Sequence, residues 1–180
     1  MYTTVDVIVT DATLEAIALR SFLEYLGVRC RMHWIGQPAD VLKAIEAVVP
    51  RPGCIVFCGH GDENGFTLPE LHESLRARQP FNDHLSPEII RERFDLSDCL
   101  VLSTACRSGE PRMGSAMLAA GAVHYLAPVD YPDGNAALYY AISFFYGLFQ
   151  LDLTVAESHL RAGRGDEDTG LFRHLGGSER

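Results

Sequence analysis

Short apolar runs rich in β-branched residues alternate along this chain with longer segments whose apolar residues recur at helical spacing. This alternation constrains the fold more than any other feature of the sequence. We predict strands over residues 5–10, 28–35, 53–59, 98–105 and 123–129. We predict helices over residues 12–26, 38–49, 86–93, 112–120, 134–151 and 154–162. Because strands that alternate with helices form right-handed βαβ units, the pattern predicts an α/β fold with a mainly parallel sheet and helices on both faces.

The length of the chain predicts one domain. It has 180 residues, of which 47% are hydrophobic, so it can bury a core of ordinary size, and we expect a single domain over residues 1–180. Residues 60–85 are the least regular part, and a connection of that length in a compact domain is usually functional. Residues 163–180 are polar and rich in glycine, and we expect them to be partly frayed.

Charge and hydropathy exclude several classes of function. Asp and Glu number 24 and Lys and Arg number 15, which gives a net charge of −9. Such a chain lacks the basic face of a nucleic-acid-binding module and is repelled by anionic lipid, but it is compatible with a cationic substrate or partner. No apolar run reaches the roughly 20 residues of a membrane span. The first residues lack the basic and apolar regions of a signal peptide.

The cysteine pattern indicates a reducing compartment. The five cysteines are Cys30, Cys54, Cys58, Cys99 and Cys106; their number is odd and no two form a CxxC pair. This usage is typical of a reduced cytoplasmic protein and not of a disulfide scaffold. A cysteine on an apolar strand usually behaves as a small hydrophobe, so we assign every cysteine except Cys106 to the core.

The carboxyl ends of the predicted strands are where a parallel sheet of this kind binds ligands. His60 lies between two glycines after the third strand, and Cys106 follows the fourth strand. If these strands are neighbours, about 4.8 Å apart, the imidazole and the thiol can face each other. The histidine can then accept the thiol proton while the sulfur attacks a carbonyl carbon. The backbone N–H groups of Gly61 and Cys106 are candidates for an oxyanion hole.

Around these residues the chain resembles the CHAT-type branch of the caspase-like (clan CD) cysteine peptidases. Ala105-Cys106-Arg107 matches the centre of the caspase signature, whose histidine lies about 50 residues upstream; here 106 − 60 = 46. The matching pieces, in order, are His60-Gly61, Leu96-Ser97, VLSTACRSG at 101–109, AGAV at 120–123, VDYPD at 129–133, FYGL at 145–148 and TVAE at 154–157. The resemblance covers about residues 53–162.

This resemblance implies a caspase-like three-layer sandwich with strand order 2-1-3-4-5, which places the third and fourth strands side by side. It implies a cysteine endopeptidase that acts on a protein or peptide without a cofactor, with His60 as general base and Cys106 as nucleophile. Related enzymes are often kept latent, so a regulatory partner or a homo-oligomer is expected as well.

The same resemblance places Asp130 and Asp133 in the acidic turn that can line the S1 pocket, where a carboxylate would favour Arg or Lys at P1. Residues of this kind also serve as turn residues or helix N-caps, and Asp133 precedes a predicted helix. Arg107 is a third candidate for substrate binding, through an acidic group of the substrate or by pairing with a nearby carboxylate.

We expect no metal site and no nucleotide site. Asp62, Glu63, His72 and His84 lie near His60 in the sequence, but HxH or HxxxH ligand spacing is missing. The first strand is not followed by a GxGxxG loop, and Lys43 is the only lysine, so there is no Walker lysine.

Two other functions stay open at this point. One is a catalytically silent caspase-like scaffold or partner-binding domain, and the other is a flavodoxin-like domain that binds a small ligand at the same sheet edge. The ionisation of Cys106 separates them from a peptidase, because a cysteine paired with a histidine is expected to have thiolate character near neutral pH.

Overall fold

A computed structural model describes residues 2–48 and 52–177. Its main sheet has six strands in the order β2-β1-β3-β7-β8-β9. The strands are β1 (Thr4–Val9), β2 (Arg29–Trp34), β3 (Cys54–Cys58), β7 (Leu100–Ser103), β8 (His124–Pro128) and β9 (Phe172–Gly176). The first five are parallel and β9 is antiparallel to β8. The predicted order of the five parallel strands is confirmed.

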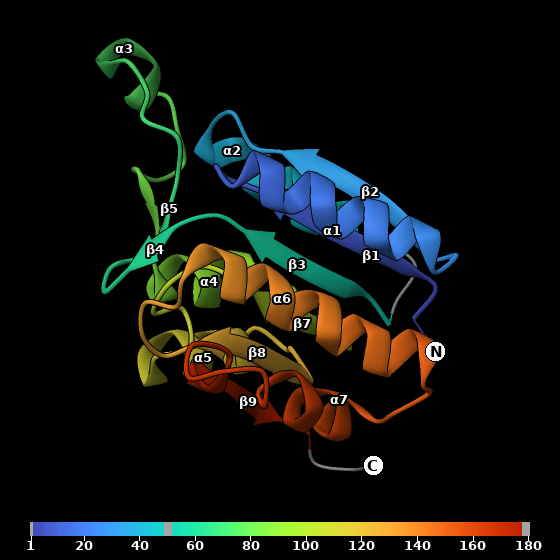
Figure 1. Cartoon of the computed structure of the whole chain (residues 1–180). Coiled ribbons are helices and arrows are strands. Elements are labelled where there is room, and N and C mark those ends of the chain that lie inside the picture. The colour runs from blue at the N-terminus through green and yellow to red at the C-terminus, as the bar shows by residue number, and fades with distance from the viewer. Residues whose placement is uncertain (1, 49–51, 178–180) are drawn as a thin grey trace.

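Helices cover both faces of this sheet (Figure 1). One face carries α1 (Thr13–Tyr25), α6 (Gly134–Phe145) and α7 (Val155–Ala162), and a π-helical turn, Tyr146–Gln150, continues α6. The other face carries α2 (Pro38–Glu46), α4 (Pro87–Arg93) and α5 (Pro111–Ala119). The result is the predicted three-layer α/β sandwich. None of the helices in the described part of the chain is long and apolar enough to cross a membrane.

The central strands are apolar throughout because both of their faces are covered. Ile55 and Phe57 of β3 pack into the core beneath α2, α4 and α5, whereas Cys54, Val56 and Cys58 pack beneath α1 and α6. Cys54, Cys58 and Cys99 are buried and Cys30 is half-buried, so the cysteines assigned to the core lie in or beside it.

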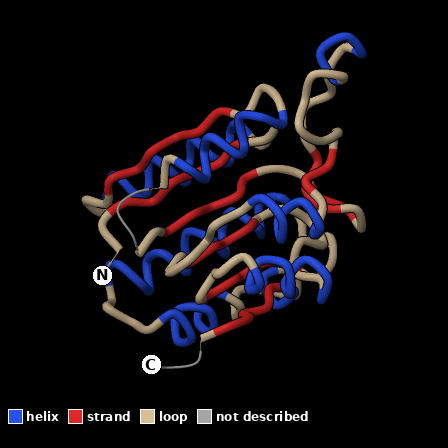
Figure 2. The backbone as a smooth tube through the Cα atoms, turned by 180° about the vertical axis from the view of Figure 1, so that it is seen from behind, coloured by secondary structure: helices blue, strands red, loops and turns tan. Residues whose placement is uncertain are grey.

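The segment predicted to be an irregular loop, 60–85, forms a projecting arm (Figure 2). Its base is a small antiparallel sheet of β4 (Gly61–Asp62), β5 (Gly65–Thr67) and β6 (His84–Leu85), and α3 (Glu73–Arg76) lies near its tip. Side-chain contacts fasten it: His84 Nε2 lies 3.2 Å from Asp62 Oδ2, and Gln79 Nε2 donates to Gln37 Oε1 just before α2, at 3.0 Å. Phe66 and Leu85 of its base pack into the same core as Phe57 of β3, which holds the residues after His60 against the main sheet.

The C-terminal segment differs from expectation. Residues 163–180 were expected to be partly frayed, but β9 pairs with β8 from His124↔Gly176 to Pro128↔Phe172. Phe172 is buried and stacks on Tyr140 of α6, with 3.7 Å between the ring centroids. Residues 178–180 lie outside the described residues. The burial of Phe172 and the hydrogen bonds to the edge of β8 stabilise this segment as a strand although its composition is polar.

Candidate active site

Strands β3 and β7 are neighbours, and their register aligns the two residues of the predicted dyad. Phe57 pairs with Ser103, and the Thr104 N–H donates to the Phe57 carbonyl oxygen at 3.0 Å. His60 lies three residues beyond Phe57, and Cys106 lies three residues beyond Ser103. Both residues therefore leave the same edge of the sheet at matching positions.

The loops that carry these residues are in close backbone contact. A Cβ added to Gly61 would lie 2.5 Å from the carbonyl oxygen of Cys106 and 3.2 Å from the Cβ of Ala105. Only a glycine fits at that distance, because the obstacle is backbone. Because Gly61 has no side chain, its backbone can pack directly against the backbone of Cys106.

His60 is an exposed side chain that lies close to an aspartate. Its Nε2 lies 3.6 Å from Oδ2 of Asp11, in the loop after β1, and the exposed fractions of the two side chains are 69% and 74%. The ends of the three adjacent strands β1, β3 and β7 thus carry Asp11, His60 and Cys106. The sequence alone predicts no role for Asp11.

Cys106 is half-buried, and its surroundings favour the neutral thiol. Burial raises the pKa of the thiol above its ordinary value, and the carboxylates of Glu15 and Asp130 raise that pKa further, against a backbone hydrogen bond that lowers it. This differs from the thiolate character expected of a paired cysteine. In the free protein a base must take the proton when the sulfur attacks.

Glu15 is a neighbour that the sequence did not single out. It lies in the first turn of α1 and its carboxylate accepts a hydrogen bond of 2.5 Å from Thr104 Oγ1. The thiol of Cys58 lies within hydrogen-bonding reach of the same carboxylate, and burial raises the pKa of Glu15. In the sequence it resembles an ordinary acidic residue at a helix N-terminus, and only the tertiary fold brings it to the strand ends.

Arg107 is paired with groups of the protein. It has a positive φ of 57°. Its Nε donates to Glu110 Oε1 at 2.6 Å, its Nη1 lies 3.1 Å from Glu63 Oε2, and its guanidinium lies 5.7 Å from the ring centroid of Tyr131. Its N–H donates to the carbonyl oxygen of Asp130 at 3.1 Å. These contacts brace the loop after Cys106 against the arm and against the loop after β8.

The two aspartates of the predicted S1 pocket lie in the loop between β8 and α6, and both are exposed. The carboxylate of Asp130 contributes to the raised pKa of the Cys106 thiol. Its Oδ1 also accepts from the Tyr131 N–H at 3.0 Å. Asp133 is the N-cap of α6, where its Oδ1 accepts from the Asn135 N–H at 2.8 Å.

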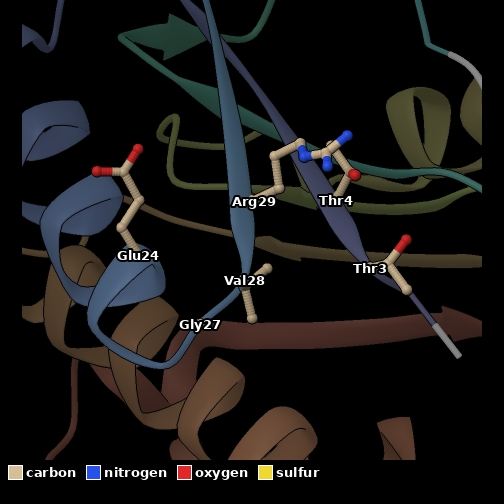
Figure 3. A pocket seen from close by; sticks show the side chains of 6 residues that line it. All are labelled: Thr3, Thr4, Glu24, Gly27, Val28 and Arg29. Carbon is tan, nitrogen blue, oxygen red and sulfur yellow. The ribbon is translucent and has the colours of Figure 1, made fainter.

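Two hollows lie at the opposite, amino edge of the sheet. One, of about 440 Å³, is lined by Thr3, Thr4, Glu24, Gly27, Val28 and Arg29 (Figure 3). The other, of about 820 Å³, has His124 and His174 among its lining residues. Neither lining includes His60 or Cys106. Within residues 2–48 and 52–177, no three His, Cys, Asp or Glu side chains are grouped so that they could hold a metal ion.

Comparison with solved structures relates this chain to cysteine proteases. The arginine-specific cysteine proteinase gingipain R superposes with a TM-score of 0.65 at 11% identity, over 94% of this chain and 44% of that chain. Separase in the Saccharomyces cerevisiae separase–securin complex gives 0.61 at 11% identity, over 98% and 12%. A secreted C11 cysteine protease from Bacteroides thetaiotaomicron, bound to an irreversible peptide inhibitor, gives 0.51 at 15% identity, over 86% and 55%.

The likeness lies in the fold and not in the sequence. No family model matches the chain, and no curated protein matches it significantly. The chain spans between about a tenth and somewhat more than half of the proteins with which it superposes. The mainly parallel sheet, its helices on both faces and these superpositions together show that the chain has the caspase-like α/β fold of those cysteine proteases.

Proposed function

We propose that this protein is a caspase-like cysteine endopeptidase, of the CHAT type, that cleaves a protein substrate through His60 and Cys106. The observation that carries the proposal is the register of β3 and β7, which leaves the two residues at matching positions on one edge of the sheet. The fold is that of cysteine proteases, and a thiol with a neighbouring imidazole is the group pair that such a reaction needs.

The proposed reaction begins with a neutral thiol. His60 takes the proton from Cys106 as the sulfur attacks the carbonyl carbon of the scissile bond, and the carbonyl oxygen becomes an oxyanion held by the N–H groups of Gly61 and Cys106. His60 then gives its proton to the leaving amine. Water, deprotonated by His60, hydrolyses the thioester and restores the free thiol. Asp11, at 3.6 Å from His60 Nε2, stabilises the imidazolium that forms in each half of the reaction.

The negative charges near Cys106 favour substrates with a basic residue at P1. Asp130 is exposed and its charge acts on the Cys106 thiol, and the chain has a net charge of −9. Gingipain R, one of the superposed structures, is described as arginine-specific. Asp133 can contribute to the same pocket while it caps α6. Arg107 is the weakest of the predicted substrate ligands, because Glu63 and Glu110 already neutralise its charge.

The proposed partners are a protein or peptide substrate and a regulatory protein or a second copy of the chain. Separase and gingipain are seen in complexes with securin and with a pro-domain, respectively, which supports control by a bound partner. The cysteines are all free thiols, which supports a cytoplasmic location.

A peptide library with varied P1 tests the proposal directly. Wild type is expected to cleave peptides with Arg or Lys at P1, and Cys106→Ala and His60→Ala are expected to abolish cleavage. Cys30→Ser is the matched control, because Cys30 is the other half-buried thiol and lies on β2. Cleavage that persists in Cys106→Ala would contradict the proposal.

A catalytically silent scaffold is the second candidate, and the raised pKa of the Cys106 thiol favours it. It predicts that neither the free chain nor the chain with a bound partner turns over any peptide. An irreversible peptide inhibitor that reacts with Cys106 but not after His60→Ala would count against this candidate.

A further inference from the structure

Glu15 occupies an unusual place for an acidic residue in the first turn of an exposed helix. The side chain before it, Leu14, is 82% exposed, whereas Glu15 is only partly accessible and its carboxylate lies against the carboxyl edge of the sheet. A carboxylate withdrawn from water must gain hydrogen bonds in return. The residues that provide them lie on the two strands that lead to the candidate dyad.

Glu15 contacts one residue before each member of the dyad. Thr104 Oγ1 donates to its Oε1 at 2.5 Å, and the thiol of Cys58 lies within reach of the same carboxylate. Thr104 lies two residues before Cys106, and Cys58 lies two residues before His60. The pairing of Phe57 with Ser103 makes Cys58 and Thr104 neighbours across β3 and β7. One carboxylate thus joins the ends of both strands.

The charge of Glu15 also acts on both members of the dyad. The electrostatic influence of His60 favours the ionised carboxylate, and the ionised carboxylate disfavours the thiolate of Cys106. The other charged groups that face this cluster are Asp11, near His60, and Asp130, near Cys106. Glu15 differs from both aspartates because it is partly buried whereas they are exposed, so its charge is screened less by water.

We propose that Glu15 is a positioning residue of the dyad, which ties together the ends of β3 and β7 that lead to His60 and Cys106. This inference rests on the proposed peptidase function. During attack, negative charge moves from sulfur to the substrate oxygen while the imidazolium remains. The repulsion between Glu15 and sulfur then falls, and its attraction for the imidazolium stabilises the intermediate.

The test compares Glu15→Gln with Glu24→Gln. The amide oxygen of glutamine can still accept the Thr104 hydroxyl, so the variant removes the charge but keeps the shape. Glu24 lies on the same helix, is exposed and pairs with Arg20 at 2.9 Å, so it is the matched control. Site-resolved iodoacetamide labelling of Cys106 is measured from pH 6 to pH 10, together with kcat and KM for a cleaved peptide.

Glu15→Gln is expected to lower the apparent pKa of Cys106 by about half a unit, which makes labelling about threefold faster near pH 7. It is expected to lower kcat about tenfold with little change in KM, because it acts on the intermediate and not on substrate binding. Glu15→Asp keeps the charge but is too short to reach Thr104; it should retain the wild-type labelling profile and lose kcat. Glu24→Gln should match wild type in every measurement.

The two proposals fail in different ways. If Glu15→Gln labels and turns over like Glu24→Gln, the role of Glu15 is wrong while the peptidase proposal stands. If no peptide is cleaved and His60→Ala leaves Cys106 labelling unchanged, the peptidase proposal is wrong, and with it the positioning role. If Glu15→Gln unfolds, the labelling profile of Glu15→Asp decides: a profile shifted to lower pH overturns the role of the charge, and a wild-type profile with a reduced kcat supports the proposal.

Discussion

The carboxylate of Asp11 lies 3.6 Å from Nε2 of His60, across the ends of two neighbouring strands, β1 and β3. Both side chains are exposed, so water screens their attraction, and pairs of this kind contribute modestly. Asp11→Asn is therefore expected to lower kcat/KM about twofold to fivefold and to leave KM unchanged. Raising the salt concentration should lower the activity of wild type more than that of the variant. An equal salt response in both would show that the two side chains do not interact during catalysis.

Gly61 is a point of close contact between the loops that carry His60 and Cys106. The Cβ of an alanine at this position would lie 2.5 Å from the Cys106 carbonyl oxygen, so the loops must separate. Displacement of about 1 Å can reduce a rate about 100-fold, so Gly61→Ala is expected to lower kcat by about tenfold to 100-fold. Gly170→Ala is the control, because its added Cβ meets only Gly163 O, at 3.8 Å. Steady-state kinetics of both variants checks this, and wild-type kcat in Gly61→Ala would refute it.

Arg107→Lys separates a bracing role from a substrate-binding role. Lysine is a point charge on a flexible stem and cannot reproduce the contacts that the guanidinium makes with Glu63, Glu110 and Tyr131. We expect kcat to fall several-fold while KM stays constant, because the loop after Cys106 loosens. If Arg107 instead binds an acidic group of the substrate, KM will rise and kcat will be preserved.

The histidines between β8, β9 and α7 predict a loss of stability in acid. Burial, with the nearby charges of His124 and His159, lowers the pKa of His174 from 6.5 to about 4. Between these two values the unfolded chain binds a proton that the folded chain does not, so stability falls as the pH drops from 6.5 towards 4. Burial lowers the pKa of His124 and His159 as well, which acts in the same direction.

His174→Gln is expected to flatten that dependence. The urea midpoint of wild type should decrease between pH 7 and pH 5 more than the midpoint of the variant. The variant loses the hydrogen bond of 3.0 Å between His124 Nδ1 and His174 Nε2, which lowers its stability at every pH. The urea midpoints of each protein are therefore compared with that protein's own midpoint at pH 7. Parallel pH profiles in the two proteins would assign the acid sensitivity to other groups.

The sequence predicts the parallel sheet well because each of its strands carries its own signal. Runs such as 54–58 are apolar at every position, and the resemblance to the caspase-like peptidases implies the order of the strands. β9 lacks such a signal, because Phe172 and Leu175 are its only apolar side chains and its pairing with β8 is long-range. The strands β4, β5 and β6 are two or three residues long, too short for a periodic pattern.

The candidate site likewise contains residues that the sequence predicts and residues that it does not. His60 and Cys106 follow strand ends, and His60 lies between two glycines, so the sequence itself marks a change of structure there. Glu15 carries no such mark, and Asp11, although it follows β1, is also an acidic residue near a helix N-terminus, which is common in any α/β protein. Asp11 and Glu15 come close to His60 and Cys106 only because β1, β3 and β7 are neighbours in the folded sheet.

The pairing of β9 with β8 has a consequence for how the chain is made. During synthesis, β8 leaves the ribosome well before Phe172 and presents an open row of backbone N–H and C=O groups in the meantime. Open edges of this kind are sites of aggregation and of wrong pairing between chains. A ribosome that pauses after residue 171, or a protease that cuts there, would leave the edge unpaired. The edge of β8 therefore stays open until residues 172–176 have been made and β9 can pair with it.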